Sequence, residues 1–410
     1  MSQNLDVPAL TVETVALDTI GPLVTLIDSH DPLLFIRRGQ GVAGIGEALR
    51  LKFSGPTRIT DAAAAWRAVV AAAHITDSVN LPGSGLVALG SFAFSDHSAA
   101  TSVLIVPSVI IGRRDGVNWI TRVNAPSAAV PVATPLGPEY RISLLPGEMS
   151  REAFVEAVDK ALVEIRAGHV HKVVLARDLI GHIPEGADLR RVLLDLSLGY
   201  PDTYTYAVNG FIGSSPETLV RVDHGTVTAR VLAGSMARGT DADSDHDAAV
   251  SLATSTKDLD EHLYALSSVM NALQPHASTL TKSEIPFALK LPNLWHLASD
   301  VEGDLSDGSS SLDLAAALHP TAAVAGTPTQ EALDLIHALE PFDRGRYSGP
   351  IGWVDANGDG KWAIALRGAH VSSTGRVTAY AGAGIVSGSD GARELAETKM
   401  KFRPIVEAFG

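Results

Sequence analysis

Cysteine is absent from all 410 residues of the chain, which excludes a disulfide framework, a thiolate nucleophile and any cysteine-ligated metal. Positive charge is scarce, because 32 lysines and arginines face 46 aspartates and glutamates for a formal net charge of −14. That balance disfavours attraction to nucleic acid or anionic lipid, and an anionic substrate would have to meet local cations. Aromatic residues make up only 5%, but the 46% apolar content is ordinary for a globular enzyme.

Long hydrophobic runs are also missing. No uninterrupted apolar stretch reaches the ~18 residues that a membrane-spanning helix needs. The start of the chain, residues 1–6, lacks the basic and apolar regions of a signal peptide. We therefore expect a soluble cytoplasmic protein with neither a membrane nor a nucleic-acid partner.

Short apolar runs separated by glycine and proline fill residues 1–145, which predicts a β-rich segment with one alanine-rich helix. From Ser150 onward, amphipathic helices alternate with strands, beginning with a capped helix that ends near Gly168. An apolar stripe from Leu259 to Leu273 predicts one long helix. The expected helices lie at 61–73, 150–168, 189–198, 247–273 and 390–408, and the expected strands at 172–179, 203–212, 218–222, 226–232, 349–371 and 377–386.

This order has no regular strand–helix–strand rhythm. It favours the α+β class, with large, mostly antiparallel sheets and helices on their outer faces. Residues 1–145 are expected to form the β-rich N-terminal part of the same domain as a catalytic core at 146–410.

Two motifs match known ligand sites without the context that either site needs. Residues 39–44 fit the dinucleotide pattern G-x-G-x-x-G, but no amphipathic helix follows, so a turn is predicted there. Asp355, Asn357 and Asp359 begin like a calcium loop, yet its twelfth position is Leu366 in place of glutamate. A hairpin turn is predicted instead.

Two side chains are candidates for proton transfer. Lys172 precedes a Val-Val-Leu run, and burial there would favour a neutral amine able to accept a proton; the alternative is an edge lysine that reaches solvent. Glu217 stands at the head of a predicted strand, where an apolar cleft would raise its pKa and keep it protonated. The alternative for Glu217 is a salt bridge with Arg221.

Two acidic pairs are candidates for metal binding. Asp258 and Glu261, like Glu394 and Glu397, are three residues apart on predicted helices, so each pair shares one helix face. All-oxygen ligation of this kind suits Mg²⁺, and the alternative is four solvated helix charges.

The run 339–352 changes from a helix end to a strand entry, and it crowds arginine, tyrosine, serine and three glycines at the junction. Exposed backbone N–H groups and a guanidinium can together hold a carboxylate. Arg344 and Arg346 within this run are equally compatible with a structural role.

Eight short motifs extend these observations, because they occur along the chain in the same order as in a known family. The chain resembles the chorismate-utilising enzymes, which include isochorismate, salicylate, anthranilate and aminodeoxychorismate synthases. The resemblance covers roughly residues 146–405 and implies one large domain in which two sheets pack around a deep site. The motifs are HKVVLAR at 171–177, SPETL at 215–219, LAGS at 232–235, KDLDEH at 257–262, HPT at 319–321, RGRYSGP at 344–350, ALR at 365–367 and GAGIV at 382–386.

The resemblance also implies a role for individual residues. Lys172 would activate water for attack at C2 of chorismate, and Glu217 would protonate the departing C4 hydroxyl. Glu261 and Glu397 would bind Mg²⁺, with Asp258 and Glu394 in supporting positions. The substrate would contact Gly234, Ser235, His296, Thr321, Tyr347, Arg367, Gly382, Gly384 and Lys401.

Differences among relatives favour the isochorismate synthase type. Lysine at position 172 indicates a water nucleophile, and Ala233 stands where aminodeoxychorismate synthases carry a nucleophilic lysine. An amidotransferase subunit is therefore not expected, and the protein is expected to be a monomer. A salicylate synthase, which eliminates pyruvate from isochorismate, is the alternative, although Met400 stands where those enzymes tend to be acidic. A third hypothesis is a non-catalytic protein that binds chorismate. The product would feed menaquinone, siderophore or salicylate synthesis, and the site does not encode which.

Overall fold

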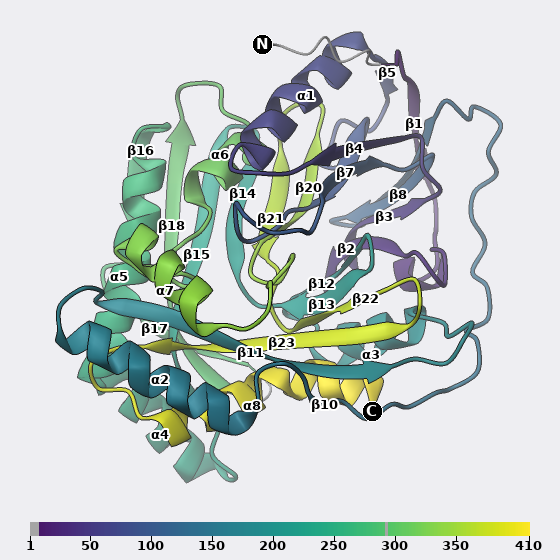
Figure 1. Cartoon of the computed structure of the whole chain (residues 1–410). Helices are drawn as coiled ribbons and strands as arrows, with labels where there is room; N and C mark the ends of the chain where they lie inside the picture. Colours follow the sequence, from purple (N-terminus) through teal and green to yellow (C-terminus); the bar gives the residue numbers. More distant parts are fainter. Residues whose placement is uncertain (1–7, 292–293) are drawn as a thin grey trace.

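The computed structural model describes residues 8–291 and 294–410. Within these residues, two large β-sheets face each other across a common core, and helices cover their outer faces (Figure 1). Among the described strands, every pairing is antiparallel except that between the first and the fifth. This arrangement confirms the predicted α+β class.

The first sheet has 13 strands among the described residues. In spatial order they are β10 (Leu145–Pro146), β11 (Lys172–His182), β23 (Arg376–Ile385), β22 (Gly368–Val371), β13 (Phe211–Ser215), β12 (Tyr204–Val208), β2 (Leu33–Arg37), β3 (Gln40–Ile45), β8 (Val109–Arg114), β9 (Val117–Val123), β1 (Thr11–Leu17) and β5 (His74–Asp77), while β19 (Gly326–Thr327) pairs with β11.

The second sheet has ten strands in the same part of the chain. In spatial order they are β16 (Ala277–Lys282), β18 (Leu294–Leu305), β15 (Thr226–Ala237), β14 (Thr218–Asp223), β21 (Gly360–Ile364), β20 (Pro350–Asp355), β6 (Val87–Ser91), β7 (Ser102–Val106) and β4 (Leu49–Phe53), while β17 (Phe287–Lys290) pairs with β18. Strands from both sides of residue 145 take part in each sheet.

The helices divide between the two sheets. Helices α2, α3 and α8 pack on the first sheet, and α4, α5 and α6 on the second, while α1 contacts α6 and β4, and α7 contacts β11 (Figure 1). A short 3₁₀ turn spans Leu23–Thr25. The helix bounds are α1 (Arg58–Ala72), α2 (Arg151–Arg166), α3 (Arg190–Gly199), α4 (Ala242–Thr254), α5 (Thr256–Leu273), α6 (Ser311–Leu318), α7 (Thr329–Leu339) and α8 (Gly391–Phe409).

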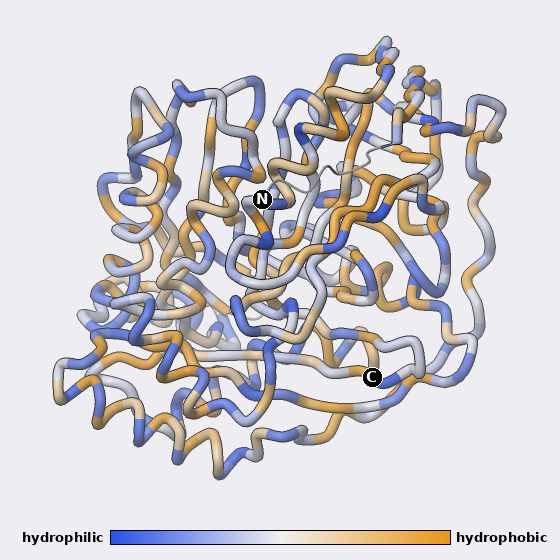
Figure 2. The backbone as a smooth tube through the Cα atoms, turned by 45° about the horizontal axis from the view of Figure 1, so that its top comes forward, coloured by the Kyte–Doolittle hydropathy of each residue, from blue (hydrophilic) through white to orange (hydrophobic). Residues whose placement is uncertain are grey.

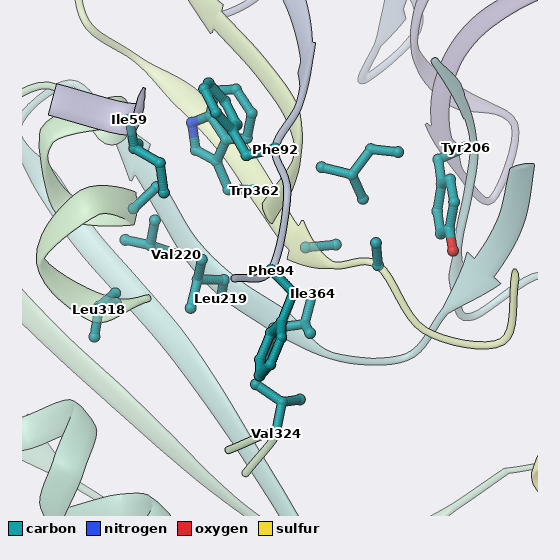
Figure 3. Packing of buried hydrophobic residues seen from close by; sticks show 14 of the residues in the cluster. Ile59, Phe92, Phe94, Tyr206, Leu219, Val220, Leu318, Val324, Trp362 and Ile364 are labelled. Atoms are coloured by element: carbon teal, nitrogen blue, oxygen red, sulfur yellow. The ribbon is translucent and has the colours of Figure 1, made fainter. Parts of the chain in front are cut away.

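The main hydrophobic core fills the space between the sheets and continues under α1, α5 and α6. Phe92 and Trp362 pack there with ring centroids 5.6 Å apart, close to Leu219 and Val220 (Figure 3). A second cluster lies between the first sheet and helices α3 and α8. Figure 2 shows hydrophobic and hydrophilic residues alternating over short distances along the chain. Of the helices in the described ranges, none combines the length and the apolar character that crossing a membrane requires.

Most predicted elements are present, with local differences. The expected helix over 247–273 is two helices, because Ser255 adopts an extended backbone and its side chain accepts a hydrogen bond from the Asp258 N–H to begin α5. The expected pair of strands over 349–371 is three, since the chain leaves the second sheet after β21 and enters the first as β22. The predicted hairpin turn after Asp355 is confirmed, and residues 39–44 lie in the β2–β3 hairpin.

Candidate active site

A cavity lies between the two sheets, at the place where the chain crosses from one sheet to the other. The crossing residue Arg367 has φ of +50°, and Ser348 beside it has φ of +64°, which are unusual for residues with a side chain. Hydrogen bonds fix this segment: Ser348 N–H donates to the Ala365 carbonyl, and the Tyr206 hydroxyl donates to the Leu366 carbonyl. Strained backbone held in this way is typical of functional sites.

The cavity contains about 590 Å³ of empty space, part of which is open to solvent. Its lining brings together ten of the residues that the sequence singled out. They are Glu217, Gly234, Ser235, Glu261, His296, Tyr347, Arg367, Gly382, Gly384 and Lys401.

Lys172 begins strand β11 and is fully buried behind the lining residue Glu261. Its Nζ lies 3.2 Å from Glu261 Oε1, and it makes no well-oriented hydrogen bond within the described ranges. Gly384, on the neighbouring strand, makes room for this pair, because a Cβ there would lie 2.4 Å from Glu261 Oε1. Sequence reasoning expected an apolar setting for the amine, whereas the carboxylate of Glu261 lies beside it.

Glu217 lies in the turn between β13 and β14 and is only 5% exposed. Burial raises the pKa of its carboxyl to about 8, although Lys172, Arg367 and Lys401 act in the opposite direction. The carboxyl is therefore protonated at neutral pH and can donate a proton, which confirms the direction predicted for its pKa. The alternative salt bridge with Arg221 is not formed, because Arg221 pairs with Asp223.

His296 and Arg367 form a hydrogen-bonded pair on the cavity wall. Arg367 Nη2 lies 3.1 Å from His296 Nε2, and since a guanidinium only donates, Nε2 must accept. Burial and the charge of Arg367 lower the pKa of His296 well below its usual value, so the ring is neutral and Nδ1 carries the proton. Nδ1 lies 3.0 Å from Ser235 Oγ and 3.2 Å from the Gly234 carbonyl oxygen.

Strand β23 and helix α8 also contribute to the cavity lining. Lys401 Nζ donates to the Gly382 carbonyl at 3.0 Å and lies 2.6 Å from Glu397 Oε1. Tyr347 stacks on Tyr380 with centroids 5.2 Å apart, and burial raises the pKa of the Tyr347 phenol, which keeps it a neutral donor. A cation and a phenol thus converge with Arg367 on one cavity in a protein of net negative charge.

One known protein family matches nearly the whole chain. A model of the family described as chorismate-binding enzymes matches residues 6–410. The chain belongs to this family.

Among relatives, isochorismate synthase DhbC of Bacillus subtilis (strain 168) is 39% identical over 286 residues, which cover 67% of this chain and 71% of that protein. The crystal structure of DhbC from Bacillus anthracis superposes with a TM-score of 0.79 at 31% identity and covers 95% of this chain and 98% of that one. MenF, the menaquinone-specific isochorismate synthase of Escherichia coli, has a TM-score of 0.77 at 22% identity, over 98% and 95% of the two chains. The last similarity concerns the fold alone.

The carboxylates expected to hold Mg²⁺ in this chorismate-binding enzyme lie on α5 and α8, and of these Glu261 lines the cavity. Burial raises the pKa of Asp258, with Glu261 and Glu397 adding to the rise, and burial together with Glu397 raises the pKa of Glu394. Three of the four are neutralised by lysines in the pairs Glu261–Lys172, Glu397–Lys401 and Glu394–Lys257.

This donor set fits Mg²⁺ in chemical type, because it offers only carboxylate oxygens and their mutual repulsion would be relieved by a cation. In the described part of the chain, the one group of three acidic or histidine ligand atoms already at ion-binding spacing is Asp223, His224 and Asp359. Asp223 is already held by Arg114 and Arg221, so its charge is neutralised.

Five of the predicted site residues stand back from the cavity lining: Lys172, Asp258, Thr321, Glu394 and Glu397. Thr321 is buried beside a smaller cavity that Glu217 also lines, and its hydroxyl has no hydrogen-bond partner in the described ranges. Asp258 packs its Cβ beside Gly234, whose φ of +82° and lack of a side chain permit the approach.

Some site residues were not found from the sequence. Tyr380 precedes Gly382 by two positions on β23, so the period of two in a strand could have placed it on the same wall. Lys257 precedes Asp258 and pairs with Glu394 on another helix, a contact that no local pattern reveals. Leu366 lines the cavity from the crossing segment.

Arg344 and Arg346 do not line the cavity, so the structural alternative applies to both. Arg344 is buried against Glu340 and donates to the carbonyl of Val174. Arg346 donates to the carbonyl of Thr101. The junction offers the cavity Tyr347 and Ser348 instead.

Proposed function

We propose that the protein is an isochorismate synthase that interconverts chorismate and isochorismate. The observation that carries this proposal is the meeting of a buried, protonated Glu217 and the Lys172–Glu261 pair at one cavity. The chain's relationship to proteins named isochorismate synthase supports it.

The proposed reaction adds water at C2 of the substrate ring and removes the hydroxyl at C4. Lys172 draws a proton from water as its oxygen bonds to C2, the ring double bond shifts, and the C4–O bond breaks. Glu217 gives its proton to the departing oxygen, so one water enters and one leaves.

Substrate carboxylates would be held by cations and by backbone N–H groups of the lining. Arg367 has no acidic partner within salt-bridge distance in the described part of the chain, so its remaining N–H groups can meet the enolpyruvyl carboxylate, with Tyr347 beside it. Gly382 and Gly384 would let the substrate approach the backbone, while Gly234, Ser235 and His296 would border the ring, with Thr321 behind them.

Mg²⁺ is the proposed cofactor, held by Glu261 and Glu397 with Asp258 and Glu394 in support. When bound, the ion neutralises these carboxylates and the ring carboxylate of chorismate. Lys401 would keep a positive charge beside Glu397. We further propose that the protein acts in the cytoplasm as a monomer without an amidotransferase subunit, in the synthesis of menaquinone or of a siderophore.

Incubation of the purified protein with chorismate and Mg²⁺, followed by chromatography, tests this function. Isochorismate is expected as the product, in equilibrium with chorismate. Salicylate and pyruvate would identify a salicylate synthase instead. Unchanged chorismate, with binding detected by calorimetry, would leave only a chorismate-binding protein.

A further inference from the structure

His262 is a buried titratable residue beside the proposed site. Neither the sequence analysis nor the proposed reaction gives it a role. It follows Glu261 on α5, is 0% exposed, and lies between α5 and the second sheet. Its Nδ1 lies 3.3 Å from the Ala233 carbonyl oxygen, and its Nε2 lies 2.8 Å from Ser299 Oγ.

The partners of His262 fix its tautomer. A carbonyl oxygen only accepts, so Nδ1 must carry the proton that points at Ala233. Nε2 then accepts the hydroxyl proton of Ser299. A neutral ring satisfies both contacts, and both of its nitrogens are used within the protein.

The carbonyl that His262 holds belongs to a β-bulge. The register of β15 against β18 shifts between Leu232 and Ser235, so that two residues of β15 stand opposite one residue of β18. The two residues are Ala233 and Gly234, and neither takes part in the ladder there. The bulge therefore lacks the ladder bonds that fix the rest of the strand, and side chains must hold it.

This bulge is part of the proposed catalytic site. Leu232, Ala233 and Gly234 line the cavity together with Glu217, and the backbone N–H of Leu232 lowers the pKa of the Glu217 carboxyl. Ala233, whose carbonyl His262 holds, thus directly follows the residue whose N–H acts on the proposed acid. On the other side of the bulge, His296 contacts the Gly234 carbonyl through its own protonated Nδ1.

We propose that His262 is a positioning residue, whose Nδ1–H bond to Ala233 fastens the 232–235 bulge, and with it the acid Glu217, to the helix that carries Glu261. The proposal rests on the isochorismate synthase function. It assigns His262 no contact with the substrate. Loss of a supporting contact of this kind typically lowers activity ~10–100-fold.

Two amide variants separate the two hydrogen bonds. Asparagine places its amide near the position of Nδ1, so H262N keeps a donor for Ala233. Glutamine reaches the position of Nε2, so H262Q keeps the contact with Ser299 and loses the one with Ala233. S267A, an exposed position on the same helix, serves as the control.

The expected result is a difference in kcat between the two amide variants. H262N should keep kcat within about threefold of the wild type, while H262Q should lose kcat ~10-fold or more with little change in KM. S267A should match the wild type. Equal kcat values for H262N and H262Q, whether both high or both low, would overturn the proposal.

Structures of the variants give a readout that does not depend on turnover. The 232–235 segment and the Glu217 side chain should keep their positions in H262N and move in H262Q. If the wild type itself fails to convert chorismate, the proposed function fails, but this structural difference still tests the role of His262. An unmoved bulge in H262Q would refute it.

Discussion

Replacement of Glu217 by glutamine tests the assignment of the proposed acid. The rise of its pKa from 4.5 to about 8 favours the neutral carboxyl by about 5 kcal/mol, since each pKa unit corresponds to ~1.36 kcal/mol. Glutamine keeps the size and neutrality of the protonated side chain but has no acidic proton to give. E217Q should therefore fold normally and lose kcat by ~10²–10⁴-fold, the usual contribution of a general acid.

The same shift predicts a pH dependence with a definite sign. Because the folded-state pKa of Glu217 is raised, its contribution to stability is fully present below pH 4.5 and is lost as pH rises through about 8. Wild-type kcat should likewise fall above about pH 8 as the acid ionises. Compared with the wild type, E217Q should gain up to about 5 kcal/mol of unfolding free energy at pH 9 and almost none at pH 4.5.

Urea unfolding at the two pH values and a chromatographic assay for isochorismate measure these effects. E331Q, a neutralisation on the exposed face of α7, is the matched control and should change neither quantity. The reasoning is refuted if E217Q retains near-wild-type kcat, or if its stability advantage is the same at both pH values.

Three further changes have defined outcomes. Chelation of divalent ions should abolish turnover, and excess Mg²⁺ should restore it. Excess Mg²⁺ should also raise the melting temperature, since a ligand at ~100 times its Kd adds ~2.7 kcal/mol of stability. Undiminished turnover in chelator would exclude the metal. G384A should lower kcat sharply while the fold persists, because its Cβ would lie 2.4 Å from Glu261 Oε1 and 3.2 Å from Lys172 Cε; wild-type kinetics would show that this pair has no part in turnover. E340A should cost about 3–5 kcal/mol of unfolding free energy by leaving Arg344 buried without its partner; a loss below 1 kcal/mol in urea would contradict that ion pair.

Local signals predicted the elements whose formation depends on local chemistry. Ser150 caps α2 and accepts the Ala153 N–H, as its position before an apolar series indicates. The Asp355 turn joins β20 to β21 for the same reason. The sequence predicts Ser255 inside one helix, whereas it caps α5. A serine is compatible with both positions, and tertiary contacts decide between them.

The site was harder to predict, since its geometry depends on contacts between distant segments. The family resemblance implied that Arg367 contacts the substrate, but not that His296, 71 positions away, accepts one of its N–H groups. Family motifs identified Lys172 and Glu261 separately. Their ion pair joins α5 to β11, two elements far apart in the sequence, and spacing along the chain does not encode such a contact.

The most direct test of the account is turnover of chorismate in water enriched in ¹⁸O, with Mg²⁺ present and the product analysed by mass spectrometry and NMR. Attack of water at C2, with departure of the C4 hydroxyl, predicts isochorismate that carries one ¹⁸O atom at C2. Isochorismate without the label would contradict the proposed water nucleophile, and chorismate recovered unchanged would contradict the function itself.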